Sequence, residues 1–256
     1  DYIIGDAVVT PLTHAAHYSE KIAQMPVCYQ PNDRKRPLPR PMQRADVGLP
    51  EAAVVLCGSN QPYKISPQGM DVRCALLHDT PHAVLWLLDW HSQARPNLER
   101  EFLARGVELN RVHWAPRMDL ADHLSRMSLA DIFIDTWPCN AHTTASDALW
   151  AGVPVVTFAG DTFASRVASS LLHAVGLDDL ICDGLTEYQH TIKALASDPA
   201  RRAALRAALL QARETAPLFD SEKFTRDYEA LLHRMHTRHM QGLPVVSLAA
   251  VVSGAV

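Results

Sequence analysis

The sequence lacks features that would point to several common classes of protein. Its five cysteines are scattered, odd in number and never separated by two residues, which argues against a disulfide framework and against structural zinc. The formal net charge is −4 and the pI is about 6.4, so no basic field points to nucleic acid. We therefore expect a protein of the reducing cytoplasm that has no nucleic-acid partner and binds any anion at a local site.

Long apolar runs are also missing. The longest one, Leu243–Val256, is interrupted by a proline, two serines and a glycine, and it is too short to span a bilayer. We expect it to form a packed or frayed tail, and we expect no membrane partner. The chain opens without methionine inside the strand-like run Asp1–Asp6, so we expect it to be a piece of a longer protein.

Motifs of metal chemistry are absent as well. The sequence has no Asp-x-Asp, no His-Glu-x-x-His and no carboxylate pair beside the Thr143-Thr144 dipeptide. His233, His236 and His239 recur at a spacing of three and could mimic a metal-binding helix face. No carboxylate follows them, so we interpret them as a solvated stripe. We predict neither a metal nor a cofactor.

What the sequence does contain is an alternation of short apolar runs with helical patterns. With 48% hydrophobic and 20% charged residues, its 256 positions can form one large or two small cores. Several runs are apolar throughout, as expected for strands buried on both faces, so the predicted fold class is α/β, a mainly parallel sheet flanked by helices. The predicted strands are Tyr2–Ile4, Pro26–Tyr29, Ala53–Cys57, Ala83–Leu88, Val112–Trp114, Ile132–Ile134 and Pro154–Phe158. The predicted helices are Tyr18–Ala23, Pro67–His78, Pro96–Ala104, Leu120–Met127, Thr143–Ala151, Ala164–His173, Tyr188–Ala196, Pro199–Thr215 and Ser221–Arg238.

The chain divides into three segments. Residues 1–50 form a lead-in segment, whose stretch Pro31–Pro50 contains five prolines and five basic residues. Repeated proline prevents both an α-helix and the hydrogen-bond ladder of a β-sheet, so we interpret this stretch as a solvated surface loop. The alternative is that its basic residues bind phosphate. Residues 51–220 carry the main strand–helix pattern. Residues 221–256 contain a last helix and the apolar tail.

The stretch 135–156 is the most informative part of the chain. It follows the predicted strand Ile132–Ile134 and opens a helix at Thr143-Thr144, whose free N–H groups would face the carboxyl edge of the sheet. The two threonine hydroxyls add donors for a diphosphate. Asp147, one helical turn further on, could accept hydrogen bonds from a ribose. Alternatively, Thr143 or Thr144 only caps the helix, and Asp147 complements its dipole.

Two further segments follow predicted strands and would reach the same edge. The loop after Ala53–Cys57 carries Lys64, whose charge could neutralise a diphosphate. The helix after Val112–Trp114 carries His123 and Arg126, and a histidine ring there could stack on a base. Taken singly, these could be a solvated loop lysine and a surface histidine. Their position at successive strand ends favours a binding site.

At these residues the chain resembles the C-terminal catalytic, donor-binding region of O-GlcNAc transferases, in particular bacterial homologues, which are relatives of the plant SPINDLY proteins. The resemblance runs from Asp1 to about Arg238. Its segments, in chain order, are Asp1–Ile4, Tyr18–Ile22, Met25–Pro26, Tyr63–Ile65, Val84–Leu88, Leu129–Asp131, Cys139–Thr144 and Ala164–Ala168. It implies the GT-B fold, in which two Rossmann-like domains face each other across a cleft. Residues 51–220 would be the C-terminal one, which binds the nucleotide sugar.

The resemblance also implies roles for residues near the phosphates of the donor. Lys64 would be the catalytic residue and would contact the diphosphate, with help from Gln61. His142, Thr143 and Thr144 would hold the phosphates at the helix terminus. SPINDLY-type proteins, which use GDP-fucose, lack the histidine at this turn, so the resemblance favours UDP-GlcNAc.

For the nucleoside half of the donor, the resemblance implies three residues. His123 would stack on uracil, Arg126 would support His123, and Asp147 would bind the ribose. The lysine that the family carries just before this helix has no clear counterpart, and Arg117 lies nearest to its place.

The activity that the resemblance implies is an inverting, metal-independent transfer of GlcNAc from UDP-GlcNAc to serine and threonine hydroxyls of proteins. The tetratricopeptide repeats and the first Rossmann-like domain of the family are absent from this chain, so we expect an N-terminal catalytic lobe to supply the general base and the acceptor contacts. Segments 1–50 and 221–256 would border that lobe, and the last helix and tail could pack back on it. The alternatives are a protein glycosyltransferase that uses GDP-fucose or UDP-glucose, and a nucleotide-sugar-binding or docking module without catalysis.

Overall fold

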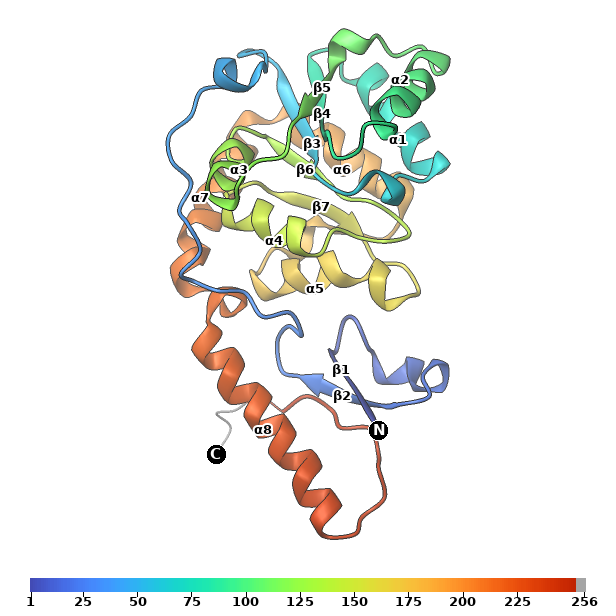
Figure 1. The fold of residues 1–256 in the computed structure, drawn as a ribbon, viewed down its shortest axis with the longest axis vertical. Coiled ribbons are helices and arrows are strands. Elements are labelled where there is room, and N and C mark those ends of the chain that lie inside the picture. The colour runs from blue at the N-terminus through green and yellow to red at the C-terminus, as the bar shows by residue number, and fades with distance from the viewer. Residues whose placement is uncertain (252–256) are drawn as a thin grey trace.

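The computed structural model describes residues 1–251, and its centre is a parallel sheet of six strands (Figure 1). The strand order is β5-β4-β3-β6-β7-β8. β3, β4 and β6 are buried at every position, which explains why their sequences are apolar without alternation. The strands are β3 (Val54–Gly58), β4 (Ala83–Leu88), β5 (Val112–Ala115), β6 (Ile132–Ile134), β7 (Val155–Phe158) and β8 (Ile181–Cys182).

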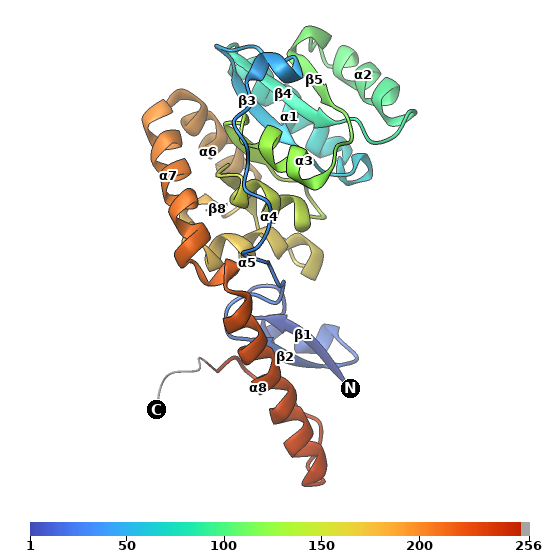
Figure 2. The same ribbon diagram turned by 60° about the vertical axis from the view of Figure 1, so that its left-hand side comes forward.

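Helices cover both faces of this sheet (Figures 1 and 2). One face carries α1 (Pro67–Asp79), α2 (Ala94–Ala104) and α6 (Leu185–Ser197). The opposite face carries α3 (Leu120–Met127), α4 (Thr143–Trp150) and α5 (Val167–Ala174). α7 (Pro199–Thr215) packs against α4 and α6 at the side.

Strands are added to the sheet in opposite directions on the two sides of the β3–β6 pair. From β3 it moves outward through α1 to β4 on one side, and from β6 it moves outward through α4 to β7 on the other. Because β3 and β6 are neighbours, the two connections diverge and leave a crevice at the carboxyl ends of these strands. In open α/β sheets this switch point is where ligands bind.

A smaller unit is built from both ends of the chain, and we call residues 1–25 together with residues 221–251 the terminal unit. Its strands β1 (Tyr2–Asp6) and β2 (Lys21–Met25) are parallel, and α8 (Ser221–Met240) crosses them (Figure 2). The other edge of β2 pairs with Leu248, whose N–H donates to the carbonyl of Ile22 at 2.7 Å. Ala23, Met25, Leu231 and Leu248 form its buried core.

Short 3₁₀ turns join many of these elements. They are η1 (Leu12–His17), η2 (Arg44–Val47), η3 (Pro62–Lys64), η4 (Leu109–Arg111), η5 (Phe163–Ser165), η6 (Asp178–Leu180) and η7 (Pro217–Phe219). Among the described residues, no helix has the length and apolar character needed to cross a bilayer.

The predicted α/β class and parallel sheet are confirmed, but the lead-in segment was misread. The predicted helix Tyr18–Ala23 is wrong, because Lys21–Met25 forms β2. The predicted strand Pro26–Tyr29 is wrong as well, since these residues form bends after β2 ends. Strand β8 was not predicted. The predicted tail is packed at Leu248, and its last residues, 252–256, lie outside the described part.

The Pro31–Pro50 stretch is not a freely solvated loop, which corrects the prediction at two of its arginines. Arg44 is half-buried, pairs with Asp131 at 2.7 Å and donates to the carbonyl of Ala53 at 2.6 Å. Arg36 reaches Asp147 on α4. We call residues 30–44 the strap, because they run across α3 and α4 (Figure 2). The prediction failed because the amino-acid composition of a proline-rich segment does not show in which direction each of its side chains points.

Candidate functional site

A pocket of about 300 Å³ lies at the carboxyl edge of the sheet, where the loops after β3, β4 and β5 meet α3 and α4. Four of the predicted site residues line it together, although they come from two different helices. The pocket is lined by Ser59, Leu88, Trp90, Arg117, Met118, Leu120, His123, Arg126, Thr144 and Asp147. Apolar, aromatic and charged groups in this combination suit a ligand with both a flat ring and hydroxyl groups.

His123 is held in this pocket as a neutral ring. Burial, together with the Arg126 and Arg36 cations, lowers its pKa from 6.5 to about 4. The guanidinium of Arg126 donates to Nδ1 of His123 at 3.1 Å, so the ring proton must reside on Nε2. A neutral ring of fixed orientation can stack on a base without the free-energy cost of removing a charged group from water.

This neutral state gives His123 a measurable effect on stability. Because its pKa in the folded protein lies below the unfolded value, falling pH protonates the unfolded chain first, and stability is lost between about pH 6.5 and pH 4. His123→Gln should therefore remove about 2 kcal/mol of the stability difference between pH 7 and pH 5. Urea unfolding at both pH values measures it. His233→Gln, at an exposed position of α8, is the matched control and should keep the wild-type difference.

Asp147 lies one turn into α4 and is 5% exposed. Its carboxylate forms an ion pair with Arg36, and its Oδ2 lies 4.0 Å from Nε2 of His123. Burial raises the pKa of Asp147, and Arg36 opposes that shift. A charged carboxylate at the pocket wall is an acceptor for hydroxyl groups of a ligand.

The turn between β6 and α4 is organised by Asp135, a fully buried carboxylate. It accepts hydrogen bonds from the backbone N–H of Thr136 (2.7 Å), the backbone N–H of Ala141 (2.6 Å) and the hydroxyl of Thr157 (2.6 Å). Burial raises the pKa of Asp135 to about 6, while these hydrogen bonds and Lys64 oppose the shift. Asp135 therefore fixes the path of the chain into the first turn of α4.

Lys64 meets this turn from η3. Its Nζ donates to the carbonyl of Asn140 at 2.6 Å, which uses one of the three N–H donors of the ammonium group. Burial and the charge of Lys64 lower the pKa of His142, whose Nε2 lies 3.4 Å from the carbonyl of Ala164. Gln61 immediately precedes η3, and its carbonyl accepts the N–H of Lys64. A cation is thus held beside the amino end of α4.

No side chain caps α4, so the interpretation of Thr143 or Thr144 as a simple cap is wrong. The hydroxyl of Thr144 donates to Oδ1 of Asn60 at 2.7 Å, and Nδ2 of Asn60 donates to Oγ1 of Thr136 at 2.9 Å. This chain of hydrogen bonds ties the end of β3 to the start of α4. Thr143 is exposed at the first position of the helix.

The structure therefore places the predicted residues in two adjoining groups. His123, Arg126, Thr144 and Asp147 line the pocket, whereas Gln61, Lys64, His142 and Thr143 lie around the amino end of α4 and do not line it. Asn60, the residue before Gln61 in the chain, accepts the hydrogen bond of the Thr144 hydroxyl. Among residues 1–251, no three His, Cys, Asp or Glu side chains gather closely enough to hold a metal ion.

Sequence reasoning missed several residues of this site. Trp90 follows the end of β4 and lines the pocket, and the guanidinium of Arg117, which was named from the sequence only as nearest to the family lysine, stacks over its ring at 4.2 Å. The place of Trp90 after a buried strand is a signal that could have found it. Arg36 carries no such signal, because it lies in the strap, far from any strand end.

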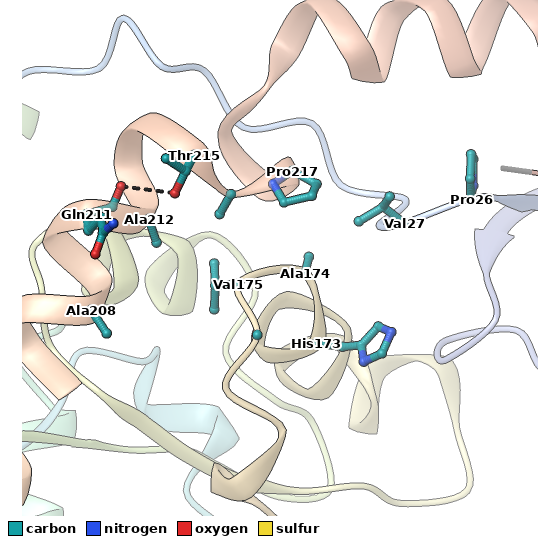
Figure 3. Close-up of a pocket in the computed structure, with 12 residues that line it drawn as sticks. Pro26, Val27, His173, Ala174, Val175, Ala208, Gln211, Ala212, Thr215 and Pro217 are labelled. Atoms are coloured by element: carbon teal, nitrogen blue, oxygen red, sulfur yellow. Dashed lines mark hydrogen bonds between the residues drawn. The ribbon is translucent and has the colours of Figure 1, made fainter. Parts of the chain in front are cut away.

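A larger pocket, of about 510 Å³, lies elsewhere, between the end of α5, α7 and the bends after β2 (Figure 3). Small apolar side chains such as Ala174, Val175 and Ala208 line most of it, and none of the predicted site residues reaches it. His173 is its one ionisable lining residue. Its chemistry does not suit a phosphorylated ligand, so the smaller pocket is the candidate site.

Comparison with known proteins supports a family assignment. Residues 41–228, more than half of the chain, match the family model described as glycosyl transferase family 41. The SEC protein of Arabidopsis thaliana, a probable UDP-N-acetylglucosamine–peptide N-acetylglucosaminyltransferase, is 35% identical over 250 residues. The SPINDLY protein of Solanum lycopersicum, which bears the same description, is 32% identical over 251 residues. Each match covers 94% of this chain and 26% of the relative, so the chain spans about a quarter of their length.

The fold comparison agrees. A mutant of the O-GlcNAc transferase of Thermobaculum terrenum superposes with a TM-score of 0.84 at 28% identity, covering 94% of this chain and 46% of that chain. Further solved glycosyltransferases share the fold at lower identity. The predicted Rossmann-like domain of the GT-B type is confirmed.

Proposed function

Because this chain belongs to glycosyl transferase family 41, we propose that it is the donor-binding C-terminal part of an enzyme that transfers GlcNAc from UDP-GlcNAc to serine and threonine hydroxyls of proteins. One observation carries the proposal. At the switch point of the sheet, a cation and an uncapped helix start adjoin a pocket that holds a neutral histidine and a buried carboxylate. That arrangement matches, in order, the diphosphate, base and ribose of a nucleotide sugar.

The proposed reaction is a single displacement with inversion at the anomeric carbon. The acceptor hydroxyl oxygen forms a bond to that carbon while the bond to the phosphate oxygen breaks, and the leaving UDP takes the electron pair. Lys64 and the N–H groups at the start of α4 stabilise the charge that grows on the diphosphate, so we propose that no metal ion is required. The hydroxyl proton passes to a base outside this chain.

We further propose that an N-terminal lobe with tetratricopeptide repeats completes the enzyme and binds the acceptor protein. The relatives extend well beyond the matched region, which supports a longer protein. Residues 1–50 and 221–256 would border this lobe, since α8 and the tail expose large apolar side chains. These are Leu232, Met240, Leu243, Val245, Val246 and Val251. The five free cysteines fit the reducing cytoplasm that we propose for the enzyme.

Titration calorimetry of this chain with UDP and with GDP, both in EDTA, tests the donor. We expect UDP to bind at least about tenfold more tightly than GDP, because the pocket beside His123 is small, and we expect Thr144→Val to weaken UDP binding. Preference for GDP would support the GDP-fucose alternative. Binding of neither nucleotide would refute the donor site and support the docking module. Competition by UDP-glucose distinguishes the remaining alternative donor.

A further inference from the structure

We propose that Arg36 is a positioning residue for ribose recognition, which holds the Asp147 carboxylate where it accepts hydrogen bonds from the hydroxyls of the nucleotide. The inference rests on the proposed donor site and adds a residue from the strap to it. Arg36 itself is not among the residues that line the pocket, so it must act through Asp147.

The contact between these two side chains is almost fully removed from solvent. The side chain of Arg36 is 11% exposed and that of Asp147 is 7% exposed, and NH2 of Arg36 binds Oδ1 of Asp147. The second oxygen, Oδ2, faces Nε2 of His123 at 4.0 Å and is the one directed toward the pocket residues. One oxygen of Asp147 is therefore used for orientation, and the other remains available to a ligand.

The strap is fixed to the two helices on both sides of Arg36. Its backbone and side chains contact α4 before and after this position, and α3 further along. The hydrogen bonds are Gln30 Nε2 to Ser146 Oγ (2.7 Å), Trp150 Nε1 to the carbonyl of Pro37 (2.8 Å) and the N–H of Arg40 to Ser125 Oγ (2.9 Å). Directional contacts of this kind place the guanidinium reproducibly, as a positioning role requires.

The burial of Asp147 explains why a fixed cation is needed. Burial of Asp147 favours its protonated carboxyl group, which accepts fewer hydrogen bonds than the carboxylate does. The charge of Arg36 opposes this effect. NH1 of Arg36 has no hydrogen-bond partner among the described residues, although it is buried. The hydrogen bond that the structure does show for the Arg36 side chain is the one from NH2 to Asp147.

Calorimetry with UDP and 2′-deoxy-UDP tests the proposal in this chain. The wild type should prefer UDP about tenfold, since a hydroxyl-to-carboxylate hydrogen bond is lost in the deoxy compound. In Arg36→Gln the preference should fall to within about twofold, because the affinity for UDP drops and that for 2′-deoxy-UDP changes little. Arg40→Gln is the matched control. It removes an exposed strap arginine that pairs with Asp122, and it should keep the wild-type preference.

The outcomes separate this inference from the proposed function. If the wild type binds neither compound, both fail. If the wild type binds UDP without preferring it, or if Arg36→Gln weakens both compounds equally, the positioning role is refuted and the donor site stands. Arg36→Lys keeps the charge but not the planar fork, so it should show an intermediate preference. If thermal unfolding shows that Arg36→Gln is not folded, Arg36→Lys replaces it in the test. A preference for UDP equal to that of the wild type in Arg36→Lys would then refute the proposal.

Discussion

Lys64→Ala is expected to lower kcat/KM at least about a hundredfold in the full-length enzyme. The ammonium group is fixed against the carbonyl of Asn140 at 2.6 Å, beside the start of α4, and keeps two N–H donors for the diphosphate. Its interaction strengthens as the bond to the leaving UDP breaks, so its loss should reduce kcat more than it raises KM for the donor. Steady-state kinetics with a peptide acceptor measure both constants.

Lys193→Ala provides the control for this substitution. Lys193 is a partly exposed lysine of α6 that pairs with Asp79 at 3.0 Å, far from the carboxyl edge of β3, and its removal should leave the kinetics unchanged. A Lys64→Ala enzyme that keeps more than about a tenth of wild-type kcat/KM would show that Lys64 does not stabilise the leaving group. A large rise in KM with unchanged kcat would assign it to ground-state binding only.

Asp135→Ala should have the largest effect on stability, a loss of about 3–5 kcal/mol. The substitution leaves two backbone N–H groups and the Thr157 hydroxyl without their acceptor in a fully buried place. Because Asp135 shapes the turn that carries Asn140 and leads to α4, the affinity for UDP should fall as well. Urea unfolding and calorimetry measure the two effects.

A matched aspartate lies at the end of the next strand. Asp161 follows β7 and is exposed, so Asp161→Ala should change neither the unfolding midpoint nor UDP binding. An Asp135→Ala protein that unfolds within about 1 kcal/mol of the wild type would mean that water replaces the carboxylate. The turn would then not depend on this side chain.

The central sheet could be predicted from sequence because its signals are local. The strand Ala83–Leu88 and the helices Leu120–Met127 and Pro199–Thr215 were predicted with the bounds that the structure has. Lys21–Met25 was misread because its strand state depends on pairing with β1 and with Leu248, which no local pattern reveals. Strand β8 has only two residues, too few to show a period.

The candidate site was predictable to the extent that it follows the rule for strand ends. His123 follows β5 and Thr144 follows β6, so they could be assigned to one edge of the sheet, and the structure brings them into one pocket. Arg36 could not be assigned in this way, because a proline-rich strap obeys no period and its course is set by contacts with Ser146 and Trp150. The division at residues 50 and 220 stays a prediction, as do the ligand roles of the site residues.

The pairing of β2 with the tail has a consequence for the order of folding. Ile22 N donates to Ser247 Oγ, and these two residues are 225 positions apart in the chain. Closing so long a loop costs conformational entropy, and the cost falls only once the six-stranded sheet between them has become compact. The central sheet should therefore fold first and the terminal unit last. The same unit, with its small core, should be the first part to open when the protein is destabilised.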